Sequence, residues 1–312
     1  MKILVTGGAG FIGSNVVDAL INEGYEVAVV DNLSTGKKEN LNPKAKFYNV
    51  DIRDTDAIQS VFQEFRPEIV YHLAAQIDVR KSVANPAFDA EVNVVGSANL
   101  FKLAVDFGVK RIIFSSTGGA LYGQVDEIPA DEDTPIRPIC AYGVAKYCTE
   151  QYLDYFKRLY GIERVILRYA NVYGPRQDPL GEAGVVAIFT GRILKGEPIT
   201  IFGDGNQTRD YVYIGDIVSA NLLALNGREG TYNIGTGVET SVNELVQMFE
   251  KILGKKITPI YAPKRQGEVD RIALDIGKAK NELRFEPKYN IEEGIKKTIE
   301  WYERDVLNDA KF

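Results

Sequence analysis

Histidine and cysteine are scarce in this sequence, and their scarcity excludes several kinds of site. The chain has one histidine, His72, and two cysteines, Cys140 and Cys148, among 312 residues. One histidine cannot build a multi-histidine metal centre, and these three residues lack the spacing of zinc ligands. The two cysteines would lie about 12 Å apart on one helix, which is too far for a disulfide. We therefore expect no metal site, no disulfide, and packing roles for all three side chains.

Long apolar runs and an excess of positive charge are also missing. No apolar run approaches the ~20 residues of a membrane span, and the run Ile3–Val5 is too short for the core of a signal peptide. The 37 Lys and Arg residues are outnumbered by 43 Asp and Glu, which gives a net charge of −6. The sequence therefore lacks a basic footprint for nucleic acid or for a membrane surface. We expect a cytoplasmic protein without either partner.

The composition is that of a globular protein, with 45% apolar and 26% charged residues. These values exclude a disordered chain, a collagen-like chain and a coiled-coil rod. Because domains usually hold about 100–200 residues, this length favours two domains.

Short apolar runs alternate with helix-length amphipathic stretches in the first half of the chain. The predicted strands are KILVTGG, EVAVVDN, AKFYNVDI, EIVYHLAA, RIIFSST and ERVILRYANVYG, and the predicted helices span 11–24, 57–65 and 89–107. This alternation predicts an α/β protein with a Rossmann-type, doubly wound parallel sheet covered by helices on both faces.

Proline and glycine break this pattern after Tyr173. The segment TYNIGTG is typical of a buried strand that returns to the sheet, and amphipathic helices are predicted at 242–253 and 291–304. We therefore assign residues 1–170, with a returning segment at about 213–237, to the dinucleotide-binding Rossmann domain. Residues 171–212 and 238–312 form a second, smaller α/β substrate domain in this prediction.

A glycine-rich turn joins the first predicted strand to the first helix. Gly7, Gly8, Gly10 and Gly13 fit both the Gly-x-Gly-x-x-Gly fingerprint and the Gly-x-x-Gly-x-x-Gly variant of short-chain dehydrogenases. Such glycines let a pyrophosphate approach the backbone and the amino end of the helix. Asp31 ends the second strand about 20 residues on, as a ribose-binding acid should. No arginine follows it directly, so its carboxylate would repel a 2′-phosphate, which favours NAD over NADP.

A tyrosine and a lysine stand four residues apart in ICAYGVAKYCTEQYLDYF, which places Tyr142 and Lys146 on one face of a helix. The ammonium should lower the phenol pKa from about 10, so that the phenolate takes a proton from a hydroxyl while hydride leaves its carbon. Alone, such a pair often occurs by chance. However, Ser115, Ser116 and Thr117 end the fifth strand, where ligands of doubly wound sheets bind, and one of their hydroxyls could donate to the reacting oxygen.

The chain also contains, in this order, TGGAGFIGS, DNLSTG, VYHLAAQ, SSTGGALYG, AYGVAK, RYANVYGP and RDYVYIGD. Together these segments resemble the extended short-chain dehydrogenase/reductase family. The likeness runs through nearly the whole chain, to RQGEVDRIALDIGKAK, and is closest to the family's UDP-glucose (UDP-galactose) 4-epimerases. The resemblance implies an isomerase that interconverts UDP-glucose and UDP-galactose through a transient 4-keto sugar, with bound NAD.

The resemblance also implies roles for single residues. Tyr142 would be the base, Lys146 its partner, and Thr117 the assisting hydroxyl; Ser116 is a rival because this loop is one residue longer than the epimerase motif. The implied NAD contacts are Gly7, Gly10, Phe11, Ile12, Gly13, Asp31, Asn32, Asp51, Ile52, Ala74, Gln76, Asn93, Tyr142, Lys146 and Tyr169. The implied substrate contacts are Thr117 and Tyr142, Asn171, Arg209 and Arg265 on the diphosphate, Glu268 on the uridine ribose, and Phe202 on the uracil.

Several alternatives remain within and outside this family. Related 4,6-dehydratases carry an Asp-Glu pair where this chain has Gly118 and Gly119, so elimination is disfavoured. A reductase, or an epimerase for N-acetylglucosamine or glucuronate nucleotides, stays open, with Ile272 at the position that resembles the gate beside the sugar C2 group. A catalytically silent NAD sensor is disfavoured because Tyr142 and Lys146 are both present. Helices at 89–107 and 141–160 resemble those that pair in a dimer, so a homodimer is expected.

Overall fold

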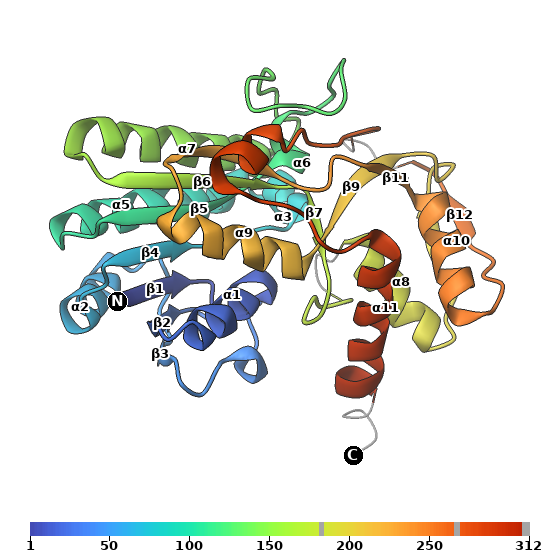
Figure 1. The fold of residues 1–312 in the computed structure, drawn as a ribbon, viewed down its shortest axis with the longest axis horizontal. Helices are drawn as coiled ribbons and strands as arrows, with labels where there is room; N and C mark the ends of the chain where they lie inside the picture. The colour runs from blue at the N-terminus through green and yellow to red at the C-terminus, as the bar shows by residue number, and fades with distance from the viewer. Residues whose placement is uncertain (181–183, 265–268, 308–312) are drawn as a thin grey trace.

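A seven-stranded parallel sheet forms the larger part of the computed structural model, which describes residues 1–180, 184–264 and 269–307 (Figure 1). The strand order is β3 (Lys46–Tyr48), β2 (Glu26–Val30), β1 (Lys2–Thr6), β4 (Ile69–His72), β5 (Arg111–Thr117), β6 (Glu163–Tyr169) and β10 (Gly230–Ile234). All neighbouring strands are parallel. Because the order reverses between β1 and β4, the sheet is doubly wound, as predicted, and its ligand crevice is expected at the carboxyl ends of these strands.

Helices cover both faces of the sheet (Figure 1). Buried side chains of α1 (Phe11–Asn22) and α9 (Ile214–Asn226) pack on one face, and those of α2 (Thr55–Phe65), α5 (Ser97–Asp106) and α7 (Ala141–Tyr160) pack on the other. Strand residues alternate between these two cores because successive side chains of a strand point to opposite faces. Ile3 and Val5 of β1 therefore belong to the first core and Leu4 to the second.

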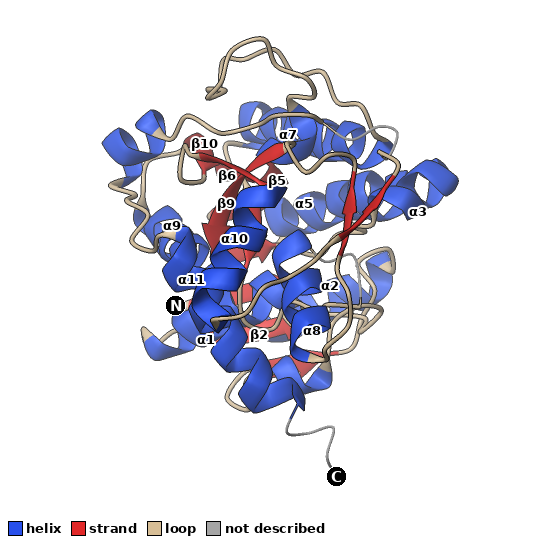
Figure 2. Ribbon diagram, turned by 90° about the vertical axis from the view of Figure 1, so that its right-hand side faces the viewer, coloured by secondary structure: helices blue, strands red, loops and turns tan. Residues whose placement is uncertain are grey.

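Smaller sheets and three helices build the other part of the molecule (Figures 1 and 2). Strands β7 (Asn171–Tyr173), β9 (Thr208–Tyr213) and β11 (Glu239–Ser241) form one sheet, and β8 (Thr200–Phe202) pairs with β12 (Ile260–Ala262). The helices are α8 (Val185–Leu194), α10 (Val242–Leu253) and α11 (Ile291–Tyr302). The strand predicted from TYNIGTG is β10, which pairs with β6. The domain boundaries stay a prediction.

The single strand expected from ERVILRYANVYG is wrong, because the chain changes sheets within it. Strand β6 ends at Tyr169, and the Ala170 amide donates to the Ile234 carbonyl at 2.8 Å. Strand β7 then pairs with β9, in register Asn171 to Tyr211. Because of this change of sheet, Asn171 belongs to the smaller part and not to the Rossmann sheet.

The single helix expected over 89–107 is also interrupted. Helix α4 (Pro86–Ala90) leads into a π-helical turn, Glu91–Gly96, before α5 begins. The Asn93 carbonyl accepts hydroxyl bonds from Ser97 at 2.6 Å and Thr149 at 2.7 Å, and such side-chain insertions loosen the helical ladder. The predicted helix 291–304 likewise ends at Tyr302 and continues as a π-helical turn, Glu303–Leu307.

The sequence predicts packing roles for the single histidine and the two cysteines of this chain. His72 is buried, with its ring nitrogens 2.8 Å from the hydroxyl oxygens of Thr6 and Ser97. Cys140 and Cys148 are free thiols. Within the three described ranges, no helix combines the length and apolarity needed to cross a membrane.

Candidate active site

The glycine-rich turn lies between β1 and α1, and its backbone leaves no room for side chains. A Cβ on Gly13 would lie 2.1 Å from the Gly7 carbonyl oxygen, and one on Gly7, where φ is +72°, would lie 2.7 Å from the Ala74 nitrogen. Gly10 caps α1 without a side-chain hydrogen bond. The exposed amide groups at this helix end therefore fit the pyrophosphate of a dinucleotide.

Asp31 follows β2 and folds back on the glycine-rich turn. Its carboxylate accepts hydrogen bonds from the amides of Ala9 at 3.0 Å and Leu33 at 2.8 Å. Burial raises its pKa although both bonds act in the opposite direction. This is the position that a ribose-binding acid needs, close to the pyrophosphate cradle.

Asn32 and Asp51 lie side by side beyond β2. The Asn32 amide donates to Asp51 at 2.8 Å, and the Arg53 guanidinium lowers the pKa of Asp51 to about 2. Ile52, the next residue, is buried and would lie about 3.2 Å from a Cβ on Gly96. The hydrogen bond between Asn32 and Asp51 thus joins two of the predicted NAD contacts next to Asp31.

The side chains of Asn93 and Tyr169, two predicted NAD contacts, form hydrogen bonds within the protein. Asn93 exchanges two hydrogen bonds of 2.9 Å with the backbone of Gln76, and so holds the segment that follows β4. The Tyr169 hydroxyl and the Asn221 side chain of α9 form hydrogen bonds of 2.8 and 3.1 Å. Their direct contact with NAD stays a prediction.

The four-residue spacing brings Tyr142 and Lys146 together in the first turns of α7. The Lys146 nitrogen lies 5.9 Å from the centre of the Tyr142 ring and donates to the Ser115 carbonyl at 2.8 Å. Burial lowers the pKa of Lys146 to about 8, whereas the charges of Glu150 and Asp89 act to raise it.

The predicted lowering of the Tyr142 pKa is wrong for the protein without a bound cofactor. Burial raises the pKa of this phenol above its ordinary value, and Cys140 and Asp89 add to the rise. The nearby ammonium does not offset the lost solvation. A phenolate at this position therefore needs further positive charge beside it.

The hydroxyls at the end of β5 point to different partners. Ser116 donates to the Glu150 carboxylate at 2.5 Å, and Ser115 donates to the His72 carbonyl at 3.3 Å. The Thr117 oxygen accepts from the Ala120 amide at 3.2 Å and caps the short helix α6 (Gly118–Leu121). Thr117 is therefore the better candidate for the assisting hydroxyl, because the Ser116 hydroxyl already donates its proton to Glu150.

Glycines occupy the two positions, 118 and 119, at which the resemblance places the Asp-Glu pair of the dehydratases. A Cβ on Gly118 would lie 2.4 Å from Leu274, and one on Gly119 would lie 3.4 Å from the Asn171 side-chain oxygen and 4.0 Å from the Thr117 hydroxyl. A side chain at the first position would therefore require Leu274 to move. The second shows that Asn171 and Thr117 flank the same glycine.

The predicted substrate residues are spread over the smaller sheets. Asn171 stands on β7, Arg209 on β9 and Phe202 on β8. The half-buried Arg209 donates to the carbonyls of Thr208 at 2.8 Å and Asp270 at 3.4 Å. Arg265 and Glu268 lie outside the described residues. Ile272 is 2% exposed and belongs to the apolar core.

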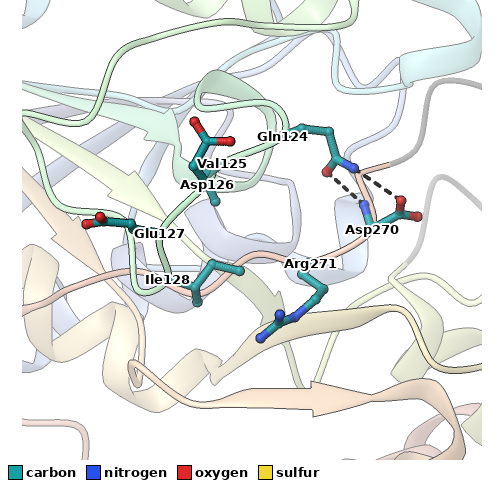
Figure 3. A pocket seen from close by; sticks show the side chains of 7 residues that line it. All are labelled: Gln124, Val125, Asp126, Glu127, Ile128, Asp270 and Arg271. Atoms are coloured by element: carbon teal, nitrogen blue, oxygen red, sulfur yellow. Dashed lines mark hydrogen bonds between the residues drawn. The ribbon is translucent and has the colours of Figure 1, made fainter.

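A pocket of about 580 Å³ (Figure 3) adjoins Arg209, because the lining residue Asp270 accepts a hydrogen bond from it. Gln124 reaches across it to Asp270, with bonds of 3.0 and 3.2 Å to the amide and the carboxylate. The remaining lining residues are Val125, Asp126, Glu127, Ile128 and Arg271. The lining thus combines three carboxyl groups with the guanidinium of Arg271, and Lys264 pairs with Asp270.

Three buried acids near the site were not among the predicted residues. Glu150 lies four residues after Lys146, so the helical spacing that revealed Tyr142 could have revealed it too. Asp89 accepts from the side chains of Gln76 at 3.0 Å and Asn93 at 3.1 Å. Asp210, beside Arg209, accepts from the backbone amides of Thr236, Gly237 and Leu274. Asp89 and Asn93 also have the four-residue spacing, whereas Asp210 lacked a spacing signal because its partners are distant in sequence.

Comparison with known proteins agrees with this geometry. A UDP-glucose 4-epimerase of Mycolicibacterium smegmatis is 44% identical over 309 residues, which cover 97% of this chain and 98% of that protein. The crystal structure of UDP-glucose 4-epimerase from Thermotoga maritima with UDP-glucose matches with a TM-score of 0.97 and 54% identity, covering 98% of this chain and 100% of that chain.

The crystal structure of Thermus thermophilus UDP-glucose 4-epimerase in complex with NAD matches with a TM-score of 0.94 and 45% identity. The match covers 98% of this chain and 100% of that chain. At the level of the family, residues 3–235 match the description "NAD dependent epimerase/dehydratase family". The chain belongs to the NAD-dependent epimerase/dehydratase family.

Proposed function

We propose that this protein is a UDP-glucose 4-epimerase, an isomerase that interconverts UDP-galactose and UDP-glucose through a transient 4-keto sugar with bound NAD. One observation carries the proposal. The Tyr142–Lys146 pair is tied to β5 beside Thr117, while glycine occupies positions 118 and 119, and a Cβ at 118 would require Leu274 to move. The site thus has the groups for oxidation at C4 without an acid for elimination.

The residues around β1 and β2 would hold the cofactor. The glycine-rich turn would bind the pyrophosphate, Asp31 the adenosine ribose, and Lys146 the nicotinamide ribose. When bound, NAD supplies a hydride acceptor that can return the hydride to the same carbon, and a positive charge near the phenol. Because the cofactor is regenerated in each cycle, it need not leave the protein.

Tyr142 would remove the proton of the sugar 4-hydroxyl, and Thr117 would share in the proton transfer. The ammonium of Lys146 favours the phenolate form that this step needs. After the keto sugar has turned over, its opposite C4 face would be reduced, and Tyr142 would return the proton to the same 4-oxygen.

The smaller sheets would hold the UDP half of the substrate. Arg209 and Arg265 would bind the diphosphate, because a guanidinium forks onto phosphate oxygens, and Asn171 would contact it as well. Glu268 would accept from the uridine ribose, and Phe202 would pack on the uracil. Firm binding of the nucleotide leaves the sugar free to rotate and still orients the reacting carbon.

The alternatives are other nucleotide-sugar enzymes on the same scaffold. An epimerase for UDP-N-acetylglucosamine or UDP-glucuronate would use the same Tyr142 chemistry, whereas a 4,6-dehydratase or a reductase is less consistent with the glycines after Thr117. Incubation with a panel of UDP-sugars, followed by separation of the products, distinguishes these epimerases.

A homodimer and a cytoplasmic location belong to the same proposal. Helix α7 exposes apolar side chains along its length, among them Val144, Tyr152, Tyr155 and Leu159. An apolar helix face of this kind is typical of an interface, and α7 also carries Tyr142 and Lys146. The low cysteine content, two residues in 312, is typical of proteins in a reducing compartment and supports the location.

The decisive experiment supplies UDP-galactose in deuterated water and follows the sugar by NMR. We expect UDP-glucose without deuterium at C5 and without a steady increase of NADH. A 4-keto-6-deoxy product, or deuterium at C5, would contradict the proposal and place the protein with the dehydratases. Free galactose should react poorly, since it lacks the UDP half.

A further inference from the structure

Glu150 and Arg168 form a buried ion pair behind the Tyr142–Lys146 pair. The side chains of Glu150 on α7 and Arg168 on β6 are 2% and 7% exposed. Arg168 donates to both carboxylate oxygens, at 3.0 and 2.7 Å. Two parallel bonds of this kind fix the orientation of a carboxylate as well as its position.

The same carboxylate also binds the strand that carries the proposed assisting hydroxyl. Ser116 on β5 donates to Glu150 at 2.5 Å, and its neighbour Ser115 accepts from Lys146 at 2.8 Å. Two residues one turn apart on α7 thus bind two consecutive residues of β5. Because Thr117 is the next residue of β5, these bonds fix the position of its hydroxyl relative to α7.

The charged and titratable groups around Lys146 are few. Tyr142 and Glu150 face it from its own helix, Asp89 from α4 and His72 from β4, with Arg168 of β6 behind Glu150. Burial and the Lys146 charge lower the pKa of His72 to about 3, so the imidazole is neutral. Of the two acids that raise the pKa of Lys146, Glu150 has the larger effect.

We propose that Glu150 is a positioning residue of the reaction: it holds α7 against β5 and keeps the Lys146 ammonium charged, while Arg168 orients the Glu150 carboxylate. This inference rests on the proposed function for its kinetic consequences only. Without Glu150, the buried Lys146 would lose its proton at lower pH, and the Tyr142 phenolate would lose its cation.

The test is the pH dependence of kcat in Glu150→Gln, which keeps the shape and a hydrogen-bond acceptor but removes the charge. In the wild type, activity should fall on the alkaline side as Lys146 titrates near its pKa of about 8. In the variant this alkaline limb should move to lower pH, with kcat reduced more than KM is changed.

Asp154→Asn is the matched control. Asp154 lies one turn further along α7 and pairs with Arg164 of β6 at 2.6 Å, so the variant removes a similar ion pair farther from Lys146. Its alkaline limb should coincide with that of the wild type. An equal shift in both variants, or an unmoved limb in Glu150→Gln, would overturn the inference.

Two further measurements keep the outcome decisive. If the unpaired Arg168 prevents folding of Glu150→Gln, the double variant Glu150→Gln/Arg168→Gln replaces it, because this variant removes both charges. The alkaline limb of the double variant should still lie at lower pH than that of the wild type. Carbon-13 NMR of the lysine ε-carbons, with Lys146 assigned by its loss in Lys146→Met, follows the same titration without turnover. A wild type without epimerase activity would defeat the proposed function, whereas the NMR titration would still decide the role of Glu150.

Discussion

The Lys146 ammonium donates a 2.8 Å hydrogen bond to the main-chain carbonyl of Ser115. This bond ties α7, which carries Tyr142, to β5, which carries Thr117, the two residues that we assign to proton transfer. It also orients the ammonium, because one of its three protons is committed to a fixed oxygen. The lysine thereby serves as a structural link and as a charge beside the phenol.

Replacing Tyr142 with Phe should stop turnover and leave the fold and NAD binding nearly unchanged. The change removes one oxygen and keeps the ring, and general-base catalysis contributes about 10²–10⁴-fold. The measurement is kcat with UDP-galactose, together with circular dichroism and the NAD content of the purified protein. Tyr147→Phe, on the same helix, is the control and should keep its activity. Near-normal turnover in Tyr142→Phe would place the base elsewhere.

Thr117 and Ser116 should respond differently to loss of their hydroxyls. Thr117→Val should lower kcat strongly, and loss of the α6 cap should cost about 0.5–2 kcal/mol of stability. Ser116→Ala should lower the free energy of unfolding, because it removes a buried donor from Glu150. Steady-state kinetics and urea unfolding of both variants separate the two effects. The larger loss of kcat in Ser116→Ala would exchange their roles.

Asp31 should decide between the two nicotinamide cofactors. Asp31→Ala removes charge-assisted bonds to the adenosine ribose worth roughly 1.5–3 kcal/mol, so NAD should bind more weakly. Titration calorimetry on the cofactor-stripped protein measures both NAD and NADP. Equal affinity of the wild type for NADP would contradict the assignment. Asn40→Ala, which alters a neighbouring loop bond to the Ala9 carbonyl, controls for local disturbance.

A methyl group at Gly118 should destabilise the protein, because it would overlap Leu274. Overpacking of a buried site costs about 1–3 kcal/mol, which thermal or urea unfolding of Gly118→Ala can measure. Gly119→Ala is the matched control, since its Cβ would lie at the ordinary distance of 3.4 Å from Asn171. Equal stability of the two variants would mean that Leu274 moves aside, and that packing does not exclude an acid at position 118.

A charge on the exposed face of α7 should separate the proposed dimer. Tyr155→Glu introduces a carboxylate among exposed apolar side chains, and desolvating it in an interface is costly. Sedimentation velocity should show a dimer for the wild type and a monomer for the variant. Leu180→Glu, at a residue that is 84% exposed outside α7, should leave the dimer intact. A monomeric wild type would contradict the proposal.

The local features of this protein could be predicted from the sequence because each depends on residues close together in the chain. The glycine-rich turn and Asp31 follow from the order of strand, turn, helix and strand. The Tyr142–Lys146 pair follows from the period of a helix, as does the capped helix at 242–253, whose bounds agree with the structure. The apolar runs predicted a parallel sheet, and β10 returns to it as expected.

The remaining features depend on contacts between distant segments. Periodicity continues through Ala170, so only the pairing of β7 with β9 shows that the chain leaves the Rossmann sheet there. Three adjacent hydroxyls look alike in the sequence, and the place of Glu150 and Arg168 behind β5 decides that Ser116 is occupied. The sequence by itself determined which chemistry this protein carries. Tertiary packing decided which hydroxyl and which charges serve it, because burial and long-range partners set both orientation and pKa.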